Sequence, residues 1–387
     1  MYRSYLGGVT PIKPFSVEQG LVVVMEKIKE LMINDFPVII FIAGGSASGK
    51  TTFANNLAKQ FPEVITISMD DYYIGRKYSE ENGFNFDQPQ SIDIPLFREN
   101  IEDLKIGKTI QKPLYSFIEG GGKRIGYQEV VPCPIIIVEG LFTLSPRLVQ
   151  CADLSIFVKT NCHGRLVRRI MRDSKRTIWN QKEILSYFVS IVEPMHNNYI
   201  DCQENQADVV INNPYDPLIE PDQAGCFKEK QVKALLDNSL SIEEIQRIGA
   251  EFIAHSIQED HYFIGSGQLE GEIVRIRREQ GNLIFTYKAP VASDDLKIKN
   301  KFEFPISEKE KEKIESLFEE KMTIIKIRDI FFFNGIIFSL DRIVLDGKDL
   351  YFLEMRVKKV KEAKVLLNKL GITKSLDRRS YYEIFSE

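Results

Sequence analysis

The stretch VIIFIAGGSASGKT, from Val38 to Thr51, decides the fold of the first half of this chain. Val38–Ala43 is a short, continuous apolar run, which is typical of a strand buried on both faces. Gly44–Thr51 fits the pattern G-x-x-x-x-G-K-[ST] in full, and Thr51–Gln60 favours a helix. A strand, a glycine-rich turn and a helix in this order predict a loop that binds phosphate through backbone N–H groups and the helix N-terminus.

The loop has the residue types that ATP binding requires. Lys50 would reach the β- and γ-phosphates and take part in catalysis, and the Thr51 hydroxyl would bind Mg²⁺. The alternative is a plain glycine-rich turn, against which the flanking strand and helix argue. We therefore expect ATP, the phosphoryl donor, to contact Gly44, Gly45, Ser46, Ala47, Ser48, Gly49, Lys50, Thr51 and Thr52.

Two acidic residues follow other strand candidates. Asp70 comes just after Val64–Ser68, and Glu139 comes directly after the apolar run Ile135–Val138. Ligands of open α/β sheets bind at the carboxyl ends of the strands, so both acids should face the phosphates. Asp70 is the candidate general base, and Glu139 is the candidate partner of Thr51 in holding Mg²⁺. For each acid the alternative is a helix cap or a turn residue.

Arginines recur at spacings of three and four in the segment 165–176 and therefore share one face of a helix. Guanidinium groups bind phosphate oxygens in paired hydrogen bonds. We expect Arg165, Arg169 and Arg172 to bind phosphate as part of a closing lid. The alternative is a solvated helix face that pairs with Asp173.

The order of the elements indicates two architectures. Strand-like and helix-like segments alternate through the first two hundred residues, which predicts an α/β P-loop fold with a parallel sheet. The proline-rich stretch Asn212–Gly225 marks a boundary, and strands separated by tight-turn signals such as Asn334-Gly335 prevail after His261. We expect a P-loop domain over 1–220, a helical connector over 221–256, and an α+β antiparallel barrel domain over 257–387.

Composition excludes several classes of protein. A chain of 387 residues that is 43% hydrophobic and 27% charged predicts two or three globular domains. The net charge of −4 gives no overall electrostatic attraction to nucleic acid or to a membrane surface. The five scattered cysteines form no C-x-x-C pair, and no apolar run is long enough to span a bilayer. We expect a cytoplasmic enzyme without a signal peptide.

Charged residues alternate along the later strands. Arg275 and Arg277 share one face of a strand, as do Lys326 and Arg328. In a closed barrel such a face points inward, where basic residues would bind a polyanion and acids would hold metal ions. A solvent-facing strand of mixed charge is the alternative. The candidates are Arg275, Arg277, Lys288, Glu303, Lys326, Arg328, Asp341, Glu354 and Arg356.

The first half resembles the uridine kinase/phosphoribulokinase family over about residues 15–215. The segments ISMDDYY, NFDQP, PLYSF, IVEG, RLVRRIMRD and ADVVI occur in the family's order. The resemblance implies that Asp70 is the catalytic base and that Glu139 is the acid associated with Mg²⁺. It places the acceptor at Asp71, Tyr73, Phe86, Asp87, Tyr115 and Phe117. Ser116, Gly120 and Gln88 replace an Asp and two His of uridine kinases, which predicts a changed acceptor.

The second half resembles a CYTH domain, also called a triphosphate tunnel metalloenzyme, over about residues 255–387. The resemblance rests on the segments VRIR, LIF, FEF, KIR, LD, LEMR and RSYYE. Members of that family hydrolyse triphosphates, tripolyphosphate or pyrophosphate, or cyclise ATP. The order of the two halves resembles uridine-kinase/CYTH fusions best known in plants. The family's opening Glu-x-Glu-x-Lys strand is missing near residue 260, which predicts weaker metal binding.

Three functions follow from these features. The leading hypothesis is transfer of the ATP γ-phosphoryl group to a small hydroxylated, nucleoside-like or altered acceptor, with Mg²⁺ as cofactor. The second is a metal-dependent pyrophosphate or triphosphate hydrolase in the tunnel, with the P-loop domain regulatory. The third is a sensor that binds ATP and polyphosphate without turnover. Inorganic polyphosphate and pyrophosphate are the further ligands considered, nucleic acid and membranes are excluded, and homo-oligomerisation is left open.

Overall fold

The computed structural model describes most of the chain, and this part divides into two compact units. The described residues are 13–32, 37–75, 78, 81, 85–117, 122–177, 179–215, 227–265, 268, 271–291, 298–345, 347–357 and 360–386. The first unit comprises Met1–Arg169 and Tyr187–Tyr215, and the second comprises Ile170–Ser186 and Asp216–Glu387. Ile170–Ser186, which precede the expected boundary near residue 220, thus group with the second unit.

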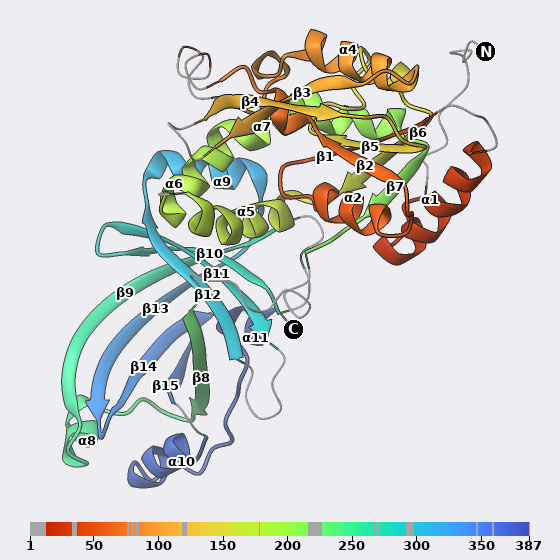
Figure 1. Ribbon diagram of the computed structural model, residues 1–387. Coiled ribbons are helices and arrows are strands. Elements are labelled where there is room, and N and C mark those ends of the chain that lie inside the picture. Colours follow the sequence, from red (N-terminus) through yellow and green to blue (C-terminus); the bar gives the residue numbers. More distant parts are fainter. Residues whose placement is uncertain are drawn as a thin grey trace. The chain divides into compact units, whose positions relative to one another are not determined.

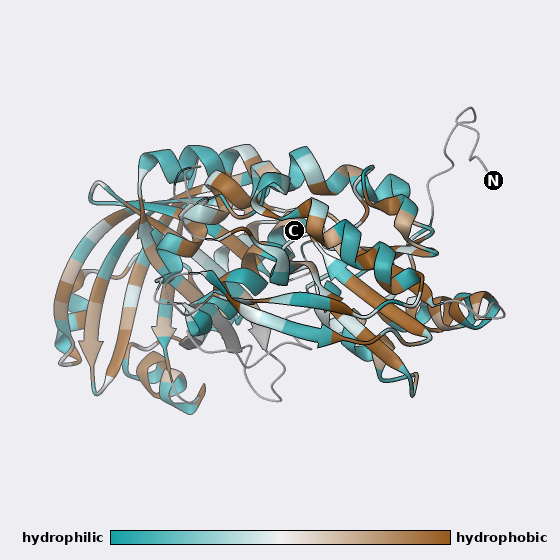
Figure 2. Ribbon diagram, turned by 45° about the horizontal axis from the view of Figure 1, so that its top comes forward, coloured by the Kyte–Doolittle hydropathy of each residue, from teal (hydrophilic) through white to brown (hydrophobic). Residues whose placement is uncertain are grey.

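A parallel sheet forms the centre of the first unit (Figure 1). Its strand order is β2-β5-β1-β6-β7, with β1 at Val38–Gly44, β2 at Val64–Ser68, β5 at Ile135–Gly140, β6 at Leu154–Lys159 and β7 at Val209–Asn212. β1 and β5 are buried along their whole length. In Figure 2 the strands of this sheet are mostly brown, as expected for a sheet covered on both faces. The predicted parallel α/β fold is confirmed.

Helices cover both faces of this sheet. α1 (Val17–Leu31) and α2 (Lys50–Ala58) pack in the apolar core on one face, and α4 (Ile94–Lys105) packs in the core on the other. β3 (Ile110–Ser116) and β4 (Lys123–Val130) form a separate antiparallel pair. Further helices are α5 at Cys162–Arg176, α6 at Gln181–Tyr187 and α7 at Glu193–Met195.

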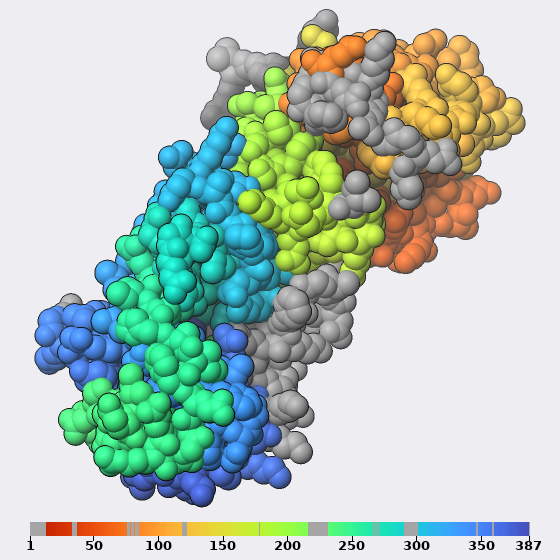
Figure 3. All heavy atoms as spheres, turned by 90° about the vertical axis from the view of Figure 1, so that its left-hand side faces the viewer, coloured from red at the N-terminus to blue at the C-terminus, as the bar shows by residue number. Residues whose placement is uncertain are grey.

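A closed barrel of eight antiparallel strands forms the centre of the second unit, in the order β10-β11-β12-β8-β15-β14-β13-β9. The strands are β8 Phe227–Leu236, β9 Glu251–Ile264, β10 Ile273–Glu279, β11 Asn282–Val291, β12 Ile298–Ile306, β13 Glu319–Phe333, β14 Ile336–Leu345 and β15 Lys348–Arg356. The helices are α8 Ile242–Arg247, α9 Glu308–Leu317, α10 Val360–Lys369 and α11 Tyr381–Phe385. In Figure 3 the green residues after 240 and the blue residues after 320 form one continuous outer surface. The predicted antiparallel barrel is confirmed.

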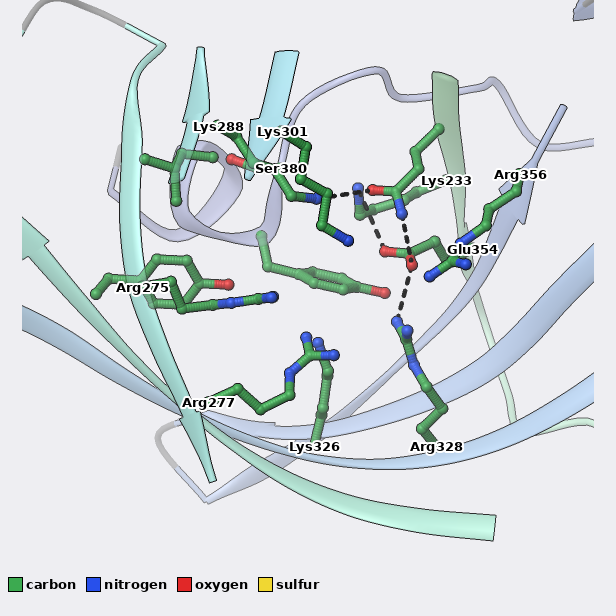
Figure 4. Close-up of a pocket in the computed structure, with 14 residues that line it drawn as sticks. Lys233, Arg275, Arg277, Lys288, Lys301, Lys326, Arg328, Glu354, Arg356 and Ser380 are labelled. Atoms are coloured by element: carbon green, nitrogen blue, oxygen red, sulfur yellow. Dashed lines mark hydrogen bonds and ion pairs between the residues drawn. The ribbon is translucent and has the colours of Figure 1, made fainter. Parts of the chain in front are cut away.

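The helical connector predicted over 221–256 is wrong where the structure describes it. This segment contains β8, the short helix α8 and the start of β9. Its Lys, Gln, Ala and Leu residues favour a helix in isolation, but pairing of β8 with β12 and β15 overrides that preference. As a strand, β8 packs Val232 and Ala234 in an apolar core with Leu366 of α10. Lys233, between them, points into the barrel (Figure 4).

No helix in the described part of the chain is long and apolar enough to cross a membrane.

Candidate functional site

The glycine-rich loop lies between β1 and α2 in the first unit. Gly49 has φ of +92°, and a Cβ atom there would lie 2.2 Å from Nδ2 of Asn213. The same Nδ2 atom donates a 2.7 Å hydrogen bond to the carbonyl oxygen of Ser48, so the loop packs directly against Asn213. Lys50 is the first residue of α2 and is largely buried. Only glycine satisfies both the backbone angle and this contact at position 49.

Hydroxyl and carboxylate oxygens meet at the carboxyl end of the sheet. β1 pairs with β5 so that Glu139 lies opposite Ile42, close to the start of the loop. The Thr51 hydroxyl donates a 3.2 Å hydrogen bond to Oε2 of Glu139, and the Ser68 hydroxyl donates a 2.7 Å bond to Oε1. Oxygen ligands of this kind suit Mg²⁺, so Thr51 and Glu139 fit the expected metal.

Two adjacent acids follow β2 and have different surroundings. Ser68 caps the short 3-10 turn Met69–Tyr72 by accepting a hydrogen bond from the backbone N–H of Asp70. Asp71 forms an ion pair with Lys112 of β3, whose side chain is largely buried. The turn therefore places Asp70 just beyond the strand end, while Asp71 is neutralised by a lysine.

Four aromatic side chains predicted to bind the acceptor lie together. The Tyr73 ring lies 5.8 Å from Phe86, 5.5 Å from Tyr115 and 5.7 Å from Phe117, between ring centroids. Burial raises the pKa of Tyr73, and the nearby carboxylates of Asp70 and Asp87 raise it further. Asp70, the candidate base, and Asp87 therefore lie near the Tyr73 ring at the centre of this cluster. Gly120, one of the altered positions, lies outside the described residues.

The arginines predicted to form a lid have different partners. Nη1 of Arg169 donates a 2.7 Å hydrogen bond to Oγ of Ser46, and its guanidinium lies 5.4 Å from the centroid of the Tyr187 ring. The same group lies 3.9 Å from Asp87. Arg169 therefore connects the phosphate loop with an acceptor-site residue.

Arg165 and Arg172 have other contacts. Arg165 is buried and pairs with Glu193 at 2.9 Å. It packs closely against the loop, because a Cβ atom on Gly45 would lie 2.8 Å from Cδ of Arg165. We interpret it as a support of the loop. Arg172 lies in the second unit, where its Nε donates to Asp173 at 2.7 Å.

The sequence patterns missed several polar residues of this site. Lys112 and Arg124 lie on the β3–β4 pair, where Lys112 binds Asp71 and Arg124 pairs with Asp93 at 2.9 Å. No sequence pattern indicated Tyr187, although its ring lies beside the guanidinium group of Arg169. The segment PLYSF, quoted for the resemblance, begins in β3 directly after Lys112 and could have directed attention to the polar residues of this hairpin.

A second candidate site fills the barrel interior. Basic side chains from six strands line one cavity (Figure 4): Lys233, Arg275, Arg277, Lys288, Lys301, Lys326, Arg328 and Arg356. Six of these were predicted from the sequence, whereas Lys233 and Lys301 were not. Glu354 also lines the cavity, whereas Asp341 lies behind it and Glu303 contacts Arg275. Lys233 was missed because its segment was interpreted as a helix.

Burial and neighbouring charges shift the pKa values of groups inside the barrel. Burial lowers the pKa of Lys326 to about 7, and the neighbouring charge of Arg277 lowers it as well. Burial opposes ionisation of Asp260, but Arg275, Lys326 and Arg277 together hold its pKa well below the ordinary value. The cavity therefore contains charged groups that are stabilised mainly by one another.

Comparisons with known proteins match one family to each half of the chain. Residues 39–219 match the Phosphoribulokinase / Uridine kinase family, and residues 228–381 match the CYTH domain. A uridine kinase of Staphylococcus aureus is 35% identical over 179 residues, covering 45% of this chain and 86% of that protein. The inorganic pyrophosphatase TTM2 of Arabidopsis thaliana is 26% identical over 381 residues, covering 95% of this chain. The related TTM1 is 33% identical over 214 residues, covering 54% of this chain and 32% of that protein.

Fold and sites together define a P-loop kinase-type unit followed by a tunnel-type barrel. The chain belongs to the phosphoribulokinase/uridine kinase family and carries a CYTH domain after the kinase-like part. Both domains indicate an enzyme. The chain spans about half the length of the plant pyrophosphatase TTM2, 54% of it.

Proposed function

We propose that the first unit transfers the γ-phosphoryl group of ATP to a hydroxyl group of a small acceptor, in the cytoplasm. The observation that carries the proposal is the meeting of Lys50, Thr51 and Glu139 at one end of the sheet, with Asp70 just beyond it. These are the residue types that phosphoryl transfer requires, since its catalysis consists mainly of positioning and electrostatic stabilisation.

The proposed reaction assigns a task to each group. The acceptor hydroxyl attacks the γ-phosphorus, its proton passes to the Asp70 carboxylate, and the bond to the β–γ bridging oxygen breaks to leave ADP. Lys50 and Arg169 stabilise the charge on the phosphoryl oxygens, and the hydrogen bond from Arg169 to Ser46 fixes it at the loop. Mg²⁺ held by Thr51 and Glu139 with the phosphates would neutralise further charge.

We further propose that the acceptor differs from uridine in its polar contacts. The cluster of Tyr73, Phe86, Tyr115 and Phe117 supports an acceptor with a planar or apolar part. Ser116 and Gln88 stand where the resemblance expects an Asp and a His. A site that lacks a substrate-specific hydrogen bond loses much of its discrimination for that substrate.

Asp70→Asn tests the proposed base against its neighbour. With an acceptor found by a thermal-shift screen of nucleosides, sugars and polyols, we expect kcat to fall about 10²- to 10⁴-fold with little change in ATP affinity. The matched variant Asp71→Asn should change mainly the KM for the acceptor, because Asp71 is held by Lys112. ADP release measures both. An Asp70→Asn protein with full kcat refutes the assignment.

A second candidate function belongs to the barrel. The basic cavity and the names of the plant relatives favour a hydrolase of pyrophosphate or a triphosphate, with a divalent metal in the reaction. Phosphate release from these compounds, measured in Lys50→Ala and in Arg277→Ala, assigns the activity. Loss of phosphate release only in Arg277→Ala supports hydrolysis in the barrel. Loss of phosphate release only in Lys50→Ala would assign the hydrolysis to the phosphate loop.

A further inference from the structure

We propose that the barrel interior binds a condensed phosphate anion of the tripolyphosphate class directly through its lysines and arginines, with no divalent metal held by the protein. The ligand class rests on the second candidate function above. The mode of binding differs from that function, which includes a divalent metal, because the acids inside the barrel are not arranged to bind a metal ion.

The carboxylate of Asp260, inside the barrel, is fully paired with cations. Oδ1 of Asp260 accepts a 2.7 Å hydrogen bond from Nε of Arg277. Oδ2 accepts bonds from Lys326 at 2.8 Å, Arg277 at 3.1 Å and Arg275 at 3.4 Å. A metal ion at Asp260 would have to displace at least one of three cations from a carboxylate without solvent exposure.

The other interior acids are occupied in the same way. Arg328 donates to both oxygens of Asp341, and the Tyr381 hydroxyl donates to Oδ2 of the same carboxylate at 2.6 Å. Glu354 pairs with Arg328 at 2.9 Å and with Lys233 at 3.6 Å. Each acid therefore serves as a counter-ion for the basic groups beside it.

Glu303 completes the set of paired acids. It lies 2.9 Å from Lys301 and 3.4 Å from Arg275, and it accepts a 3.1 Å hydrogen bond from the Thr286 hydroxyl. Among the described residues, no group of three His, Cys, Asp or Glu side chains is arranged to hold a metal ion.

β9 contributes neutral polar side chains beside Asp260. Its buried residues alternate along the strand, and Ser256 and Gln258 precede Asp260 in this series. Nε2 of Gln258 donates to Ser256 at 3.3 Å and to Glu279 at 2.8 Å. Neither side chain carries the negative charge with which a carboxylate attracts a divalent cation.

The charge balance of the cavity favours an anion instead. Among the described residues, eight basic side chains line the cavity, and Glu354 is the acid that lines it with them. Gathering basic groups in one cavity is costly unless negative charge offsets it. A linear polyanion offers several phosphate groups, and guanidinium groups bind such oxygens in pairs. A bound polyanion would add negative charge among these basic groups.

Calorimetric titration of the Lys50→Ala chain with sodium tripolyphosphate tests the proposal, because that background weakens binding at the phosphate loop. We expect one binding event per chain in EDTA, with a Kd that added Mg²⁺ does not lower. Binding that appears only when Mg²⁺ or Mn²⁺ is added overturns the proposal.

Two neighbouring arginines on β10 provide a matched pair of variants in the same background. Arg277 lines the cavity, whereas Arg278 is more exposed and pairs with Glu308 at 2.8 Å. In EDTA, Arg277→Ala should weaken tripolyphosphate binding at least tenfold and Arg278→Ala less than twofold. Equal effects of the two variants would refute an interior site. Lys288→Gln, at a half-buried position that lines the cavity, should also weaken tripolyphosphate binding. This variant replaces Arg277→Ala in the test if Arg277→Ala does not fold.

Phosphate release in Mg²⁺ separates this proposal from the hydrolase function. Hydrolysis together with binding in EDTA supports both. Hydrolysis without binding in EDTA overturns the metal-free mode and leaves the hydrolase function standing. Binding in EDTA without any hydrolysis supports the inference and refutes the hydrolase.

Discussion

At the scale of single residues, chemistry in both units depends on which partner a charged side chain receives. Asp70 and Asp71 are adjacent in the chain, and the ion pair with Lys112 is made by Asp71. Lys326 and Arg328 share one face of β13, yet burial lowers the pKa of Lys326, whereas Asp341 and Glu354 hold the pKa of Arg328 above its ordinary value despite burial. Sequence spacing predicts that such residues share a face, but it does not predict their partners.

The lowered pKa of Lys326 predicts a pH dependence of anion binding. With a folded-state pKa of about 7, Lys326 loses its proton as the pH rises through neutrality. An anion favours the charged form, so binding raises this pKa and takes up a proton. Tripolyphosphate affinity should therefore fall between about pH 6 and about pH 8, by up to about tenfold per pH unit. The groups that face Lys326 are Asp260 on β9, Arg277 on β10, Arg328 on β13, Asp341 on β14, Glu354 on β15 and the Tyr381 ring.

Titration calorimetry in two buffers of different ionisation enthalpy measures this proton uptake. Lys326→Met keeps an unbranched apolar side chain and removes the titrating group, so the tripolyphosphate affinity of this variant should change with pH only through the ligand's own titration. The same proton uptake in Lys326→Met and in the unchanged chain would contradict the role of Lys326.

At the scale of elements, local pattern predicted most of the first unit. The continuous apolar runs of β1 and β5 identified buried parallel strands, and the glycine motif identified the loop between β1 and α2. The sequence pattern predicted a helix where β8 lies, because the helix-forming residues of this segment become a strand only through pairing with β12 and β15. It also missed Lys112 of β3, which reaches Asp71 across a large sequence separation.

Two glycines test how the loop element works. Gly49 and Gly107 both have positive φ, +92° and +81°, but only at Gly49 would a Cβ atom meet another group, Nδ2 of Asn213. Each Gly→Ala change should cost about 1–2 kcal/mol through the backbone angle. Only Gly49→Ala should also abolish ATP binding, because Asn213 would have to leave the Ser48 carbonyl. Urea unfolding and nucleotide titration measure the two effects, and normal ATP binding by Gly49→Ala contradicts this view of the loop.

At the scale of the whole chain, the near balance of charge conceals strong local separation. The chain has a net charge of −4, yet eight basic residues gather in one cavity of the second unit. Their field is enclosed by the barrel and offset in part by paired acids, so it offers no extended basic surface of the kind that nucleic acids require.

This arrangement predicts selectivity for small anions over nucleic acid. We expect the chain to show no binding of a 30-base-pair DNA or RNA duplex at about 150 mM salt, while it binds tripolyphosphate. Binding of polyanions by exposed lysines falls steeply with salt, whereas enclosed charges are screened less. Fluorescence anisotropy with labelled duplexes checks this, and duplex binding that competes with tripolyphosphate would refute it.

The sequence by itself determined the phosphate loop, the parallel sheet around it and the barrel after it, because these depend on short-range patterns of glycine, apolar runs and tight turns. Only the tertiary structure decided how the charges are paired. Arg165 supports the loop from below, Lys112 neutralises Asp71, and Asp260 gathers three cations inside the barrel. Each of these pairs joins residues from different elements, and the value of a buried charge depends on the partner that the fold brings within hydrogen-bonding distance.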